Sequence, residues 1–107
     1  MKTMIEARAD ELINNAILLE LANICEVHGK KYNSNHEGYA ILKEEVEETM
    51  NNLTYILRHL KALWTYCKND NTDGVLSEAR LIGYSAMCAA EEAVQCAAVC
   101  KKIGGNV

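Results

Sequence analysis

The chain has 107 residues and a formal net charge of −4 at pH 7, and half of its residues are apolar. This length fits a single domain, residues 1–107, and the acidic balance argues against the basic surface that nucleic-acid binding requires. The chain has no run of roughly 18 apolar residues that could span a membrane, no signal-peptide core and no CxxC pair among its five cysteines, so we expect a soluble cytoplasmic protein with reduced thiols and no membrane contact.

The first predicted helix begins after Thr3, which forms a capping-box pattern with Glu6. Apolar residues then recur at helical spacing as far as Val27, and Gly29 is a typical helix stop. Residues 29–35 break this period, so we expect a loop there.

The second predicted helix begins with another capping-box pattern, Ser34 with Glu37, and runs to about Lys68. Its apolar stripe, which we expect to form the core face, consists of Leu42, Val46, Met50, Leu53, Leu57, Leu60, Trp64 and Cys67. The opposite face carries a mixed strip: Ile41, Asn52, Tyr55, His59, Ala62 and Tyr66. Ordinary solvent-exposed faces carry mainly charged residues, so this strip predicts a second covered face.

The third predicted helix follows the turn cluster 69–74, with Thr72 or Asp73 as its N-cap, and runs from about Val75 to Ile103. It has one face of mostly small residues and a second apolar strip, which predicts two helical neighbours. The chain contains no proline that would break these helices. We therefore predict an all-α bundle of three long helices, completed by a homo-oligomer partner in a dimer or tetramer.

Clustered carboxylates are the main chemical feature. Glu44, Glu45 and Glu48 lie one turn apart on the second helix, where like charges are unfavourable unless water or a cation compensates them. If the second and third helices are antiparallel, these residues lie level with Glu91, Glu92 and Gln95. Oxygen ligands from two helices are what a hard ion such as Mg²⁺ prefers, so the pattern predicts a cation site.

Two segments resemble a known family. The stretch 35–48 reads NHEGYAILKEEVEE and resembles the second helix of phage-type MazG-like proteins, which belong to the all-α nucleoside triphosphate pyrophosphatases. Residues 91–100 resemble a later helix of the same group, and the likeness covers roughly 28–50 and 88–102. In this family an ExxD motif on a facing helix joins an EExxE motif to bind Mg²⁺, and water cleaves the α–β linkage of a triphosphate.

The resemblance implies that this is a phage or prophage hydrolase that converts an NTP or dNTP to NMP and pyrophosphate. Carried onto this chain, it makes Glu45 and Glu48 catalytic. The Mg²⁺ ligands would be Glu44, Glu45, Glu48, Glu92 and Gln95. Gln95 replaces the family aspartate, which removes one charge from the site. The nucleotide would contact Lys30, Lys31, Lys43 and Tyr55.

Two other interpretations stay open. The glutamate run is also compatible with a solvated helix face. The whole chain is compatible with a non-catalytic helical interaction protein, or with a degenerate family member that binds nucleotide without turnover.

Overall fold

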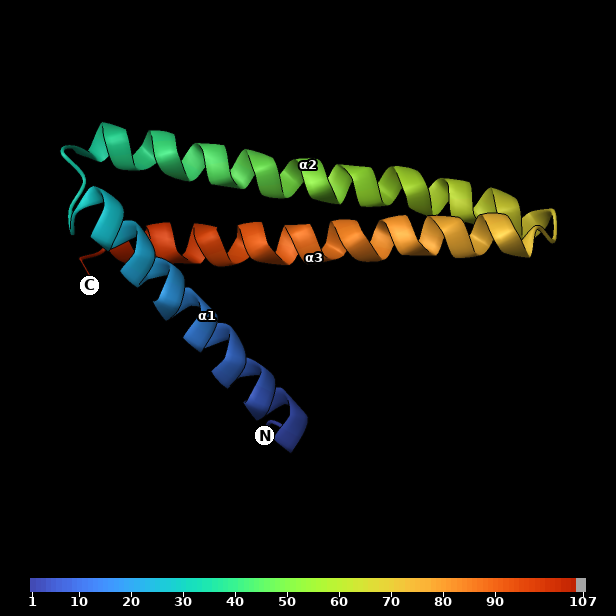
Figure 1. The fold of residues 1–107 in the computed structure, drawn as a ribbon, viewed down its shortest axis with the longest axis horizontal. Coiled ribbons are helices and arrows are strands. Elements are labelled where there is room, and N and C mark those ends of the chain that lie inside the picture. Colours follow the sequence, from blue (N-terminus) through green and yellow to red (C-terminus); the bar gives the residue numbers. More distant parts are fainter. Residues whose placement is uncertain (106–107) are drawn as a thin grey trace. The chain divides into compact units, whose positions relative to one another are not determined.

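The computed structural model describes residues 1–105, and within them it contains three α-helices and no strand. They are α1 (Met4–His28), α2 (Asn35–Lys68) and α3 (Thr72–Ile103) (Figure 1). The prediction of an all-α protein with three long helices is confirmed.

Helix α1 begins and ends where local capping predicts. The Thr3 hydroxyl accepts a hydrogen bond from the Glu6 N–H at 3.1 Å, and the Glu6 carboxylate accepts one from the Thr3 N–H at 2.8 Å. Both arms of the capping box are therefore formed. At the other end, Gly29 has a φ of 84° and donates its N–H to the Cys25 carbonyl at 2.8 Å.

The start of α2 forms only half of the predicted capping box. The Ser34 hydroxyl accepts from the Glu37 N–H at 3.1 Å. The Glu37 carboxylate, however, accepts from the backbone N–H and the side-chain amide of Asn33, at 3.2 and 3.1 Å. The capping box predicted a bond from the Ser34 backbone N–H. Asn33, one residue earlier, offers both a backbone N–H and a side-chain amide, so Glu37 bonds to Asn33 at two points.

Helix α3 begins three residues earlier than predicted, at Thr72. The Asn71 side-chain oxygen accepts from the Gly74 N–H at 2.9 Å, so Asn71 caps the helix in place of the expected Thr72 or Asp73. Asp70 has a φ of 51°, a left-handed conformation that aspartate tolerates well in turns. The helix ends at Ile103, as predicted.

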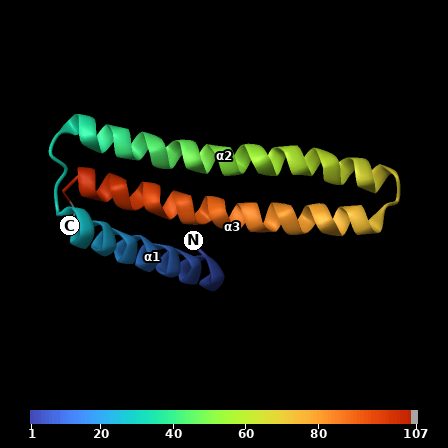
Figure 2. The same cartoon turned by 45° about the horizontal axis from the view of Figure 1, so that its top comes forward.

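The chain divides into two compact units. The boundary between them cuts α2 between residues 45 and 46 and α3 between residues 92 and 93. One, the terminal unit, contains residues 1–45 and the chain from residue 93 onward. In it the C-terminal part of α1 lies against the last turns of α3 (Figure 2). Its buried residues are Leu21, Gly38, Ala98, Val99 and Lys102.

The other, the hairpin unit, contains residues 46–92. Here α2 and α3 run antiparallel on either side of the turn that joins them (Figure 1). Its buried residues are the small Ser85 and Ala89. The His59 ring contacts the Glu78 carboxylate and lies 4.1 Å from the Tyr55 ring, centroid to centroid.

Within the hairpin unit, α3 packs against a different face of α2 from the one expected to form the core. Tyr55 and His59 of the mixed strip face α3, which confirms that this part of the strip is covered, whereas Tyr66 at its end is exposed. The apolar stripe lies on the other side of the helix, and from Val46 to Trp64 its members are 42–61% exposed. The periodicity of the stripe suits a neighbouring helix, and within the hairpin unit α3 lies against the other face of α2.

Candidate functional site

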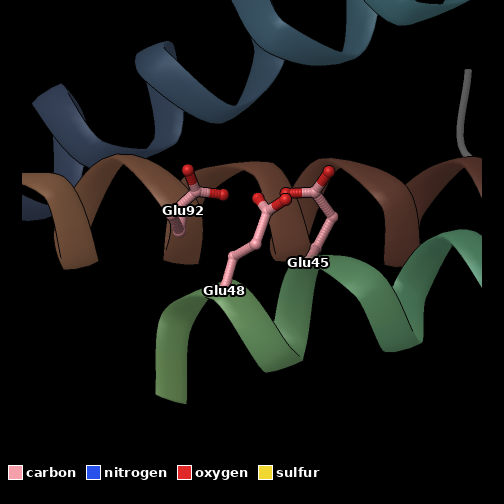
Figure 3. Close-up of side chains that lie close together, drawn as sticks. All are labelled: Glu45, Glu48 and Glu92. Carbon is pink, nitrogen blue, oxygen red and sulfur yellow. The ribbon is translucent and has the colours of Figure 1, made fainter. Parts of the chain in front are cut away.

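Three glutamates converge on one point, and we call Glu45, Glu48 and Glu92 the acidic triad. Each is partly buried, and each offers one carboxylate oxygen that lies within 4.8 Å of the other two (Figure 3). Glu45 and Glu48 follow one another at spacing i, i+3 on α2, so helix geometry directs them to the same side. Glu92 reaches them from α3 (Figure 3).

The position of Glu92 follows from counting outward along an antiparallel hairpin. A turn centred near residues 70 and 71 sets residue 48 level with residue 92, and the structure brings these two carboxyl groups into contact. The predicted pairing of acidic residues across α2 and α3 is therefore confirmed for Glu48 and Glu92.

Glu92 perturbs the carboxyl group of Glu48. A hydrogen bond with Glu92 is the largest cause that raises the pKa of Glu48, followed by the negative charge of Glu92 and then by burial. A hydrogen bond between two carboxyl groups requires a proton on one of them. The triad therefore holds a proton more tightly than isolated glutamates do, and a cation would compete with that proton.

The donor set suits a hard divalent cation. All three side chains offer carboxylate oxygens, which Mg²⁺, Ca²⁺ and Mn²⁺ prefer, and the triad contains no thiol or imidazole that would favour softer metals. If all three carboxyl groups were ionised, their negative charges would repel one another at this spacing. A bound divalent ion would remove that repulsion.

A pocket of about 560 Å³ opens in the terminal unit. Glu45 belongs both to its lining and to the triad, and Gln95 also lines the pocket. The remaining lining residues are Glu20, Ile24, His28, Tyr32, Asn33, Glu37, Ile41, Val99 and Lys102. Three glutamates and one lysine make this lining acidic, so an anionic ligand fits it best when a cation accompanies the ligand.

Sequence reasoning missed Lys102 as a pocket residue. It is only 3% exposed, and its ammonium lies 4.0 Å from the centre of the Tyr32 ring, in a cation–π contact. Lys102 also lies in the last turn of α3, where a positive charge suits the helix dipole. The available signal was its spacing from Gln95 and Val99, which puts the three residues on one face of α3.

The structure brings together only part of the predicted ligand set. Glu45, Glu48 and Glu92 converge, and Gln95 lines the pocket that Glu45 also lines. Glu44 is exposed and lies outside the acidic group that the described residues form, because it projects from α2 at a different angle from Glu45.

The predicted nucleotide contacts are dispersed. Lys31 lines a second opening of the terminal unit, together with Lys102. Lys30 and Lys43 are exposed and do not contribute to the described lining of the 560 Å³ pocket. Tyr55 packs against His59 in the hairpin unit.

Comparisons with models of protein families, with curated proteins and with solved structures found no match to this chain. Within the described residues, no helix combines the length and the apolar character needed to cross a membrane. The geometry of the triad and the lining of the pocket are therefore the features that bear on function.

Proposed function

We propose that this protein is a Mg²⁺-dependent, MazG-like nucleoside triphosphate pyrophosphohydrolase that converts an NTP or dNTP to NMP and pyrophosphate in the cytoplasm. The observation that carries the proposal is the acidic triad, in which carboxylates from two helices come within 4.8 Å of one another. The resemblance of residues 35–48 and 91–100 to that family gives the reaction its class.

The charges of the pocket support a nucleotide that arrives with its metal. Glu45, Glu48 and Glu92 would hold Mg²⁺, which polarises phosphate oxygens and lowers the pKa of a bound water. Because Glu45 also lines the pocket, a nucleotide there would have its phosphates beside the triad. Lys102 supplies the one positive charge of the described lining for a phosphate oxygen.

The residues of the triad would also handle protons. Glu48 and Glu92 share a hydrogen bond and therefore a proton, which a bound cation displaces. Glu45 or Glu48, once ionised, can accept a proton from the attacking water. Gln95 offers a neutral oxygen in place of a carboxylate, so it coordinates more weakly than the family aspartate.

A second candidate is a protein that binds nucleotide without cleaving it. Gln95 favours it, because an amide cannot act as a general base and adds no charge to the cation site. The two candidates share the triad and the pocket. They differ only in whether pyrophosphate is released.

The test measures pyrophosphate release over a panel of NTPs and dNTPs with Mg²⁺, using wild type, Glu48→Gln and Glu92→Gln. We expect each variant to lose about 100-fold or more of the activity, because loss of even an outer-shell partner of a metal site costs 10–100-fold. Glu91→Gln is the matched control, since Glu91 is exposed and adjoins Glu92 on α3. Absence of pyrophosphate from wild type with every nucleotide refutes the enzyme. Nucleotide binding without release then identifies the second candidate.

A further inference from the structure

The exposed stripe of α2 has the spacing of a coiled-coil seam. In the hairpin unit, apolar residues at 46, 50, 53, 57, 60, 64 and 67 alternate spacings of four and three, which is a period of 3.5 residues. We call the large members of this stripe the seam. Their exposed fractions are Val46 46%, Met50 54%, Leu53 42%, Leu57 61%, Leu60 52% and Trp64 61%. Period 3.5 is the pattern of a helix that packs along its length against another helix.

The hairpin unit needs such a neighbour. Its buried residues are Ser85 and Ala89, and no large side chain in the described chain is fully buried. A small domain with so little internal burial depends on another source of stability. Monomeric proteins rarely expose a contiguous apolar patch larger than a few hundred Å², and such a patch marks an interaction surface.

We propose that the seam packs on the seam of a second copy of this chain, as an antiparallel coiled coil. In heptad terms, Met50, Leu57 and Trp64 occupy a positions, and Val46, Leu53 and Leu60 occupy d positions. A two-fold axis across α2 at the level of residue 55 matches every a residue with a d residue. It pairs Met50 with Leu60 of the partner subunit, Leu57 with Leu53 of the partner subunit, and Trp64 with Val46 of the partner subunit.

Side-chain volume favours this direction. The antiparallel register sets the largest seam residue, Trp64, against the smallest, Val46 of the partner subunit. A parallel register sets every residue opposite its own copy, so that one layer holds two tryptophans and another holds two valines. Core layers of even volume pack at native density, whereas uneven layers leave cavities or strain.

Charge favours the same direction. Glu47 and Lys61 are exposed and occupy e positions on the same flank of the seam. In the antiparallel register Glu47 comes within about two residues of the level of Lys61 of the partner subunit, and the two-fold axis repeats this pair. In a parallel register Glu47 meets Leu42 of the partner subunit, and Lys61 meets Ile56 of the partner subunit. Opposite charges at flanking positions set partner orientation in coiled coils.

The seam is separate from the acidic triad. Glu48 and the seam lie on opposite sides of α2, since Glu48 faces α3 and the seam faces away from it. The second copy is therefore compatible with an open triad, and the proposal does not depend on the enzymatic function.

The first test is the mass of the full-length protein by sedimentation equilibrium. We expect a dimer for wild type. Leu57→Glu, which puts two charges near the axis, should raise the dissociation constant by about 30-fold or more, the effect of losing a central anchor. Arg58→Glu is the matched control, because Arg58 is exposed and lies off the seam, and it should leave the dimer intact. Circular dichroism of each variant shows that the helices have formed.

The second test uses charge exchange to establish direction. Glu47→Lys and Lys61→Glu should each weaken self-association, because each variant faces like charges across the axis. An equimolar mixture of the two variants should form a heterodimer. In it, position 47 of each copy faces position 61 of the other, so the two lysines of the Glu47→Lys variant face the two glutamates of the Lys61→Glu variant. Failure of the mixture to form a heterodimer overturns the antiparallel register.

The native Cys67 gives an independent readout. It continues the seam at a d position near the end of α2 and is exposed. Two copies of Cys67 adjoin in a parallel dimer but lie far apart in the antiparallel one, beyond the roughly 7 Å between Cα atoms that a disulfide allows. Mild oxidation should leave the wild-type dimer without a Cys67–Cys67 bond.

A wild-type monomer at all concentrations refutes the proposal and indicates that another segment of the same chain covers the seam.

Discussion

Glu48 links the charge of the triad to stability. Its pKa is raised above the ordinary 4.5 of a glutamate, first by the hydrogen bond with Glu92. A raised folded pKa means that the native state binds the proton more tightly than the unfolded chain does. The stabilisation that this proton provides is complete below the unfolded pKa, and it is lost as the pH rises through the folded pKa.

Replacing Glu48 with glutamine should therefore change the pH dependence of stability. Between about pH 4.5, the unfolded value, and neutrality, the free energy of unfolding of wild type should fall relative to that of Glu48→Gln. Urea denaturation of both proteins at several pH values measures this difference. Mg²⁺ should reduce it at neutral pH by neutralising the wild-type triad. Parallel pH profiles without Mg²⁺ contradict the shared proton, and Glu91→Gln controls for the loss of one charge.

Some contacts of the candidate site could be predicted from the sequence, and others could not. The Glu48–Glu92 contact was predictable, because helical periodicity and a short turn set the level of both residues. The burial of Lys102 was not, since its ring partner Tyr32 lies in the loop before α2, where no periodic rule applies. Glu44 and Glu45 belong to the same motif, but neighbouring residues on a helix point in different directions around its axis. The motif alone does not say which of the two side chains points toward α3.

At the scale of elements, the close approach of α2 and α3 beside their turn depends on Gly74. A Cβ built there overlaps the ring carbons of Tyr66 near the base of that side chain, where rotation gives little relief. Gly83 lies on the same helix, and a Cβ there meets nothing within 4 Å. The same substitution should therefore have opposite effects at the two positions.

Gly74→Ala should destabilise the protein by about 1–3 kcal/mol, the usual cost of overpacking, less any gain in helix propensity. Gly83→Ala should stabilise it by about 0.5–1 kcal/mol, because alanine restricts the unfolded chain and favours the helix. Thermal unfolding of both variants measures the two effects under the same conditions. A stabilising Gly74→Ala would show that the Tyr66 ring moves aside without cost.

Helix ends were predictable where a single local contact decides them. Thr3 with Glu6, and Gly29, bound α1 as expected. The start of α3 was not, because Asn71, Thr72 and Asp73 are all competent N-caps and sequence alone does not rank them. The α2 stripe illustrates a different limit. Periodicity indicates that a face packs against another helix, but it does not say whether that helix belongs to the same chain.

At the scale of the molecule, internal burial is small. The buried apolar residues of the described chain are Leu21, Ala89, Ala98 and Val99, three of them in α3. Large apolar side chains on every helix remain exposed, among them Ile5, Leu57 and Met87. Exposed apolar side chains gain hydrophobic stabilisation when they are buried, and burial through association would couple stability to concentration.

This coupling predicts that the unfolding temperature rises with protein concentration. If the seam forms the dimer, mass action stabilises the folded state as concentration increases, so scanning calorimetry of wild type across a wide concentration range should show a steady increase. Leu57→Glu should shift the increase to higher concentrations, because its dimer dissociates about 30-fold or more readily. Glu48→Gln should retain it, because the triad lies on the opposite side of α2 from the seam. A concentration-independent unfolding temperature for wild type would contradict the dimer. Loss of the increase in Glu48→Gln would show instead that the triad and the seam are energetically coupled.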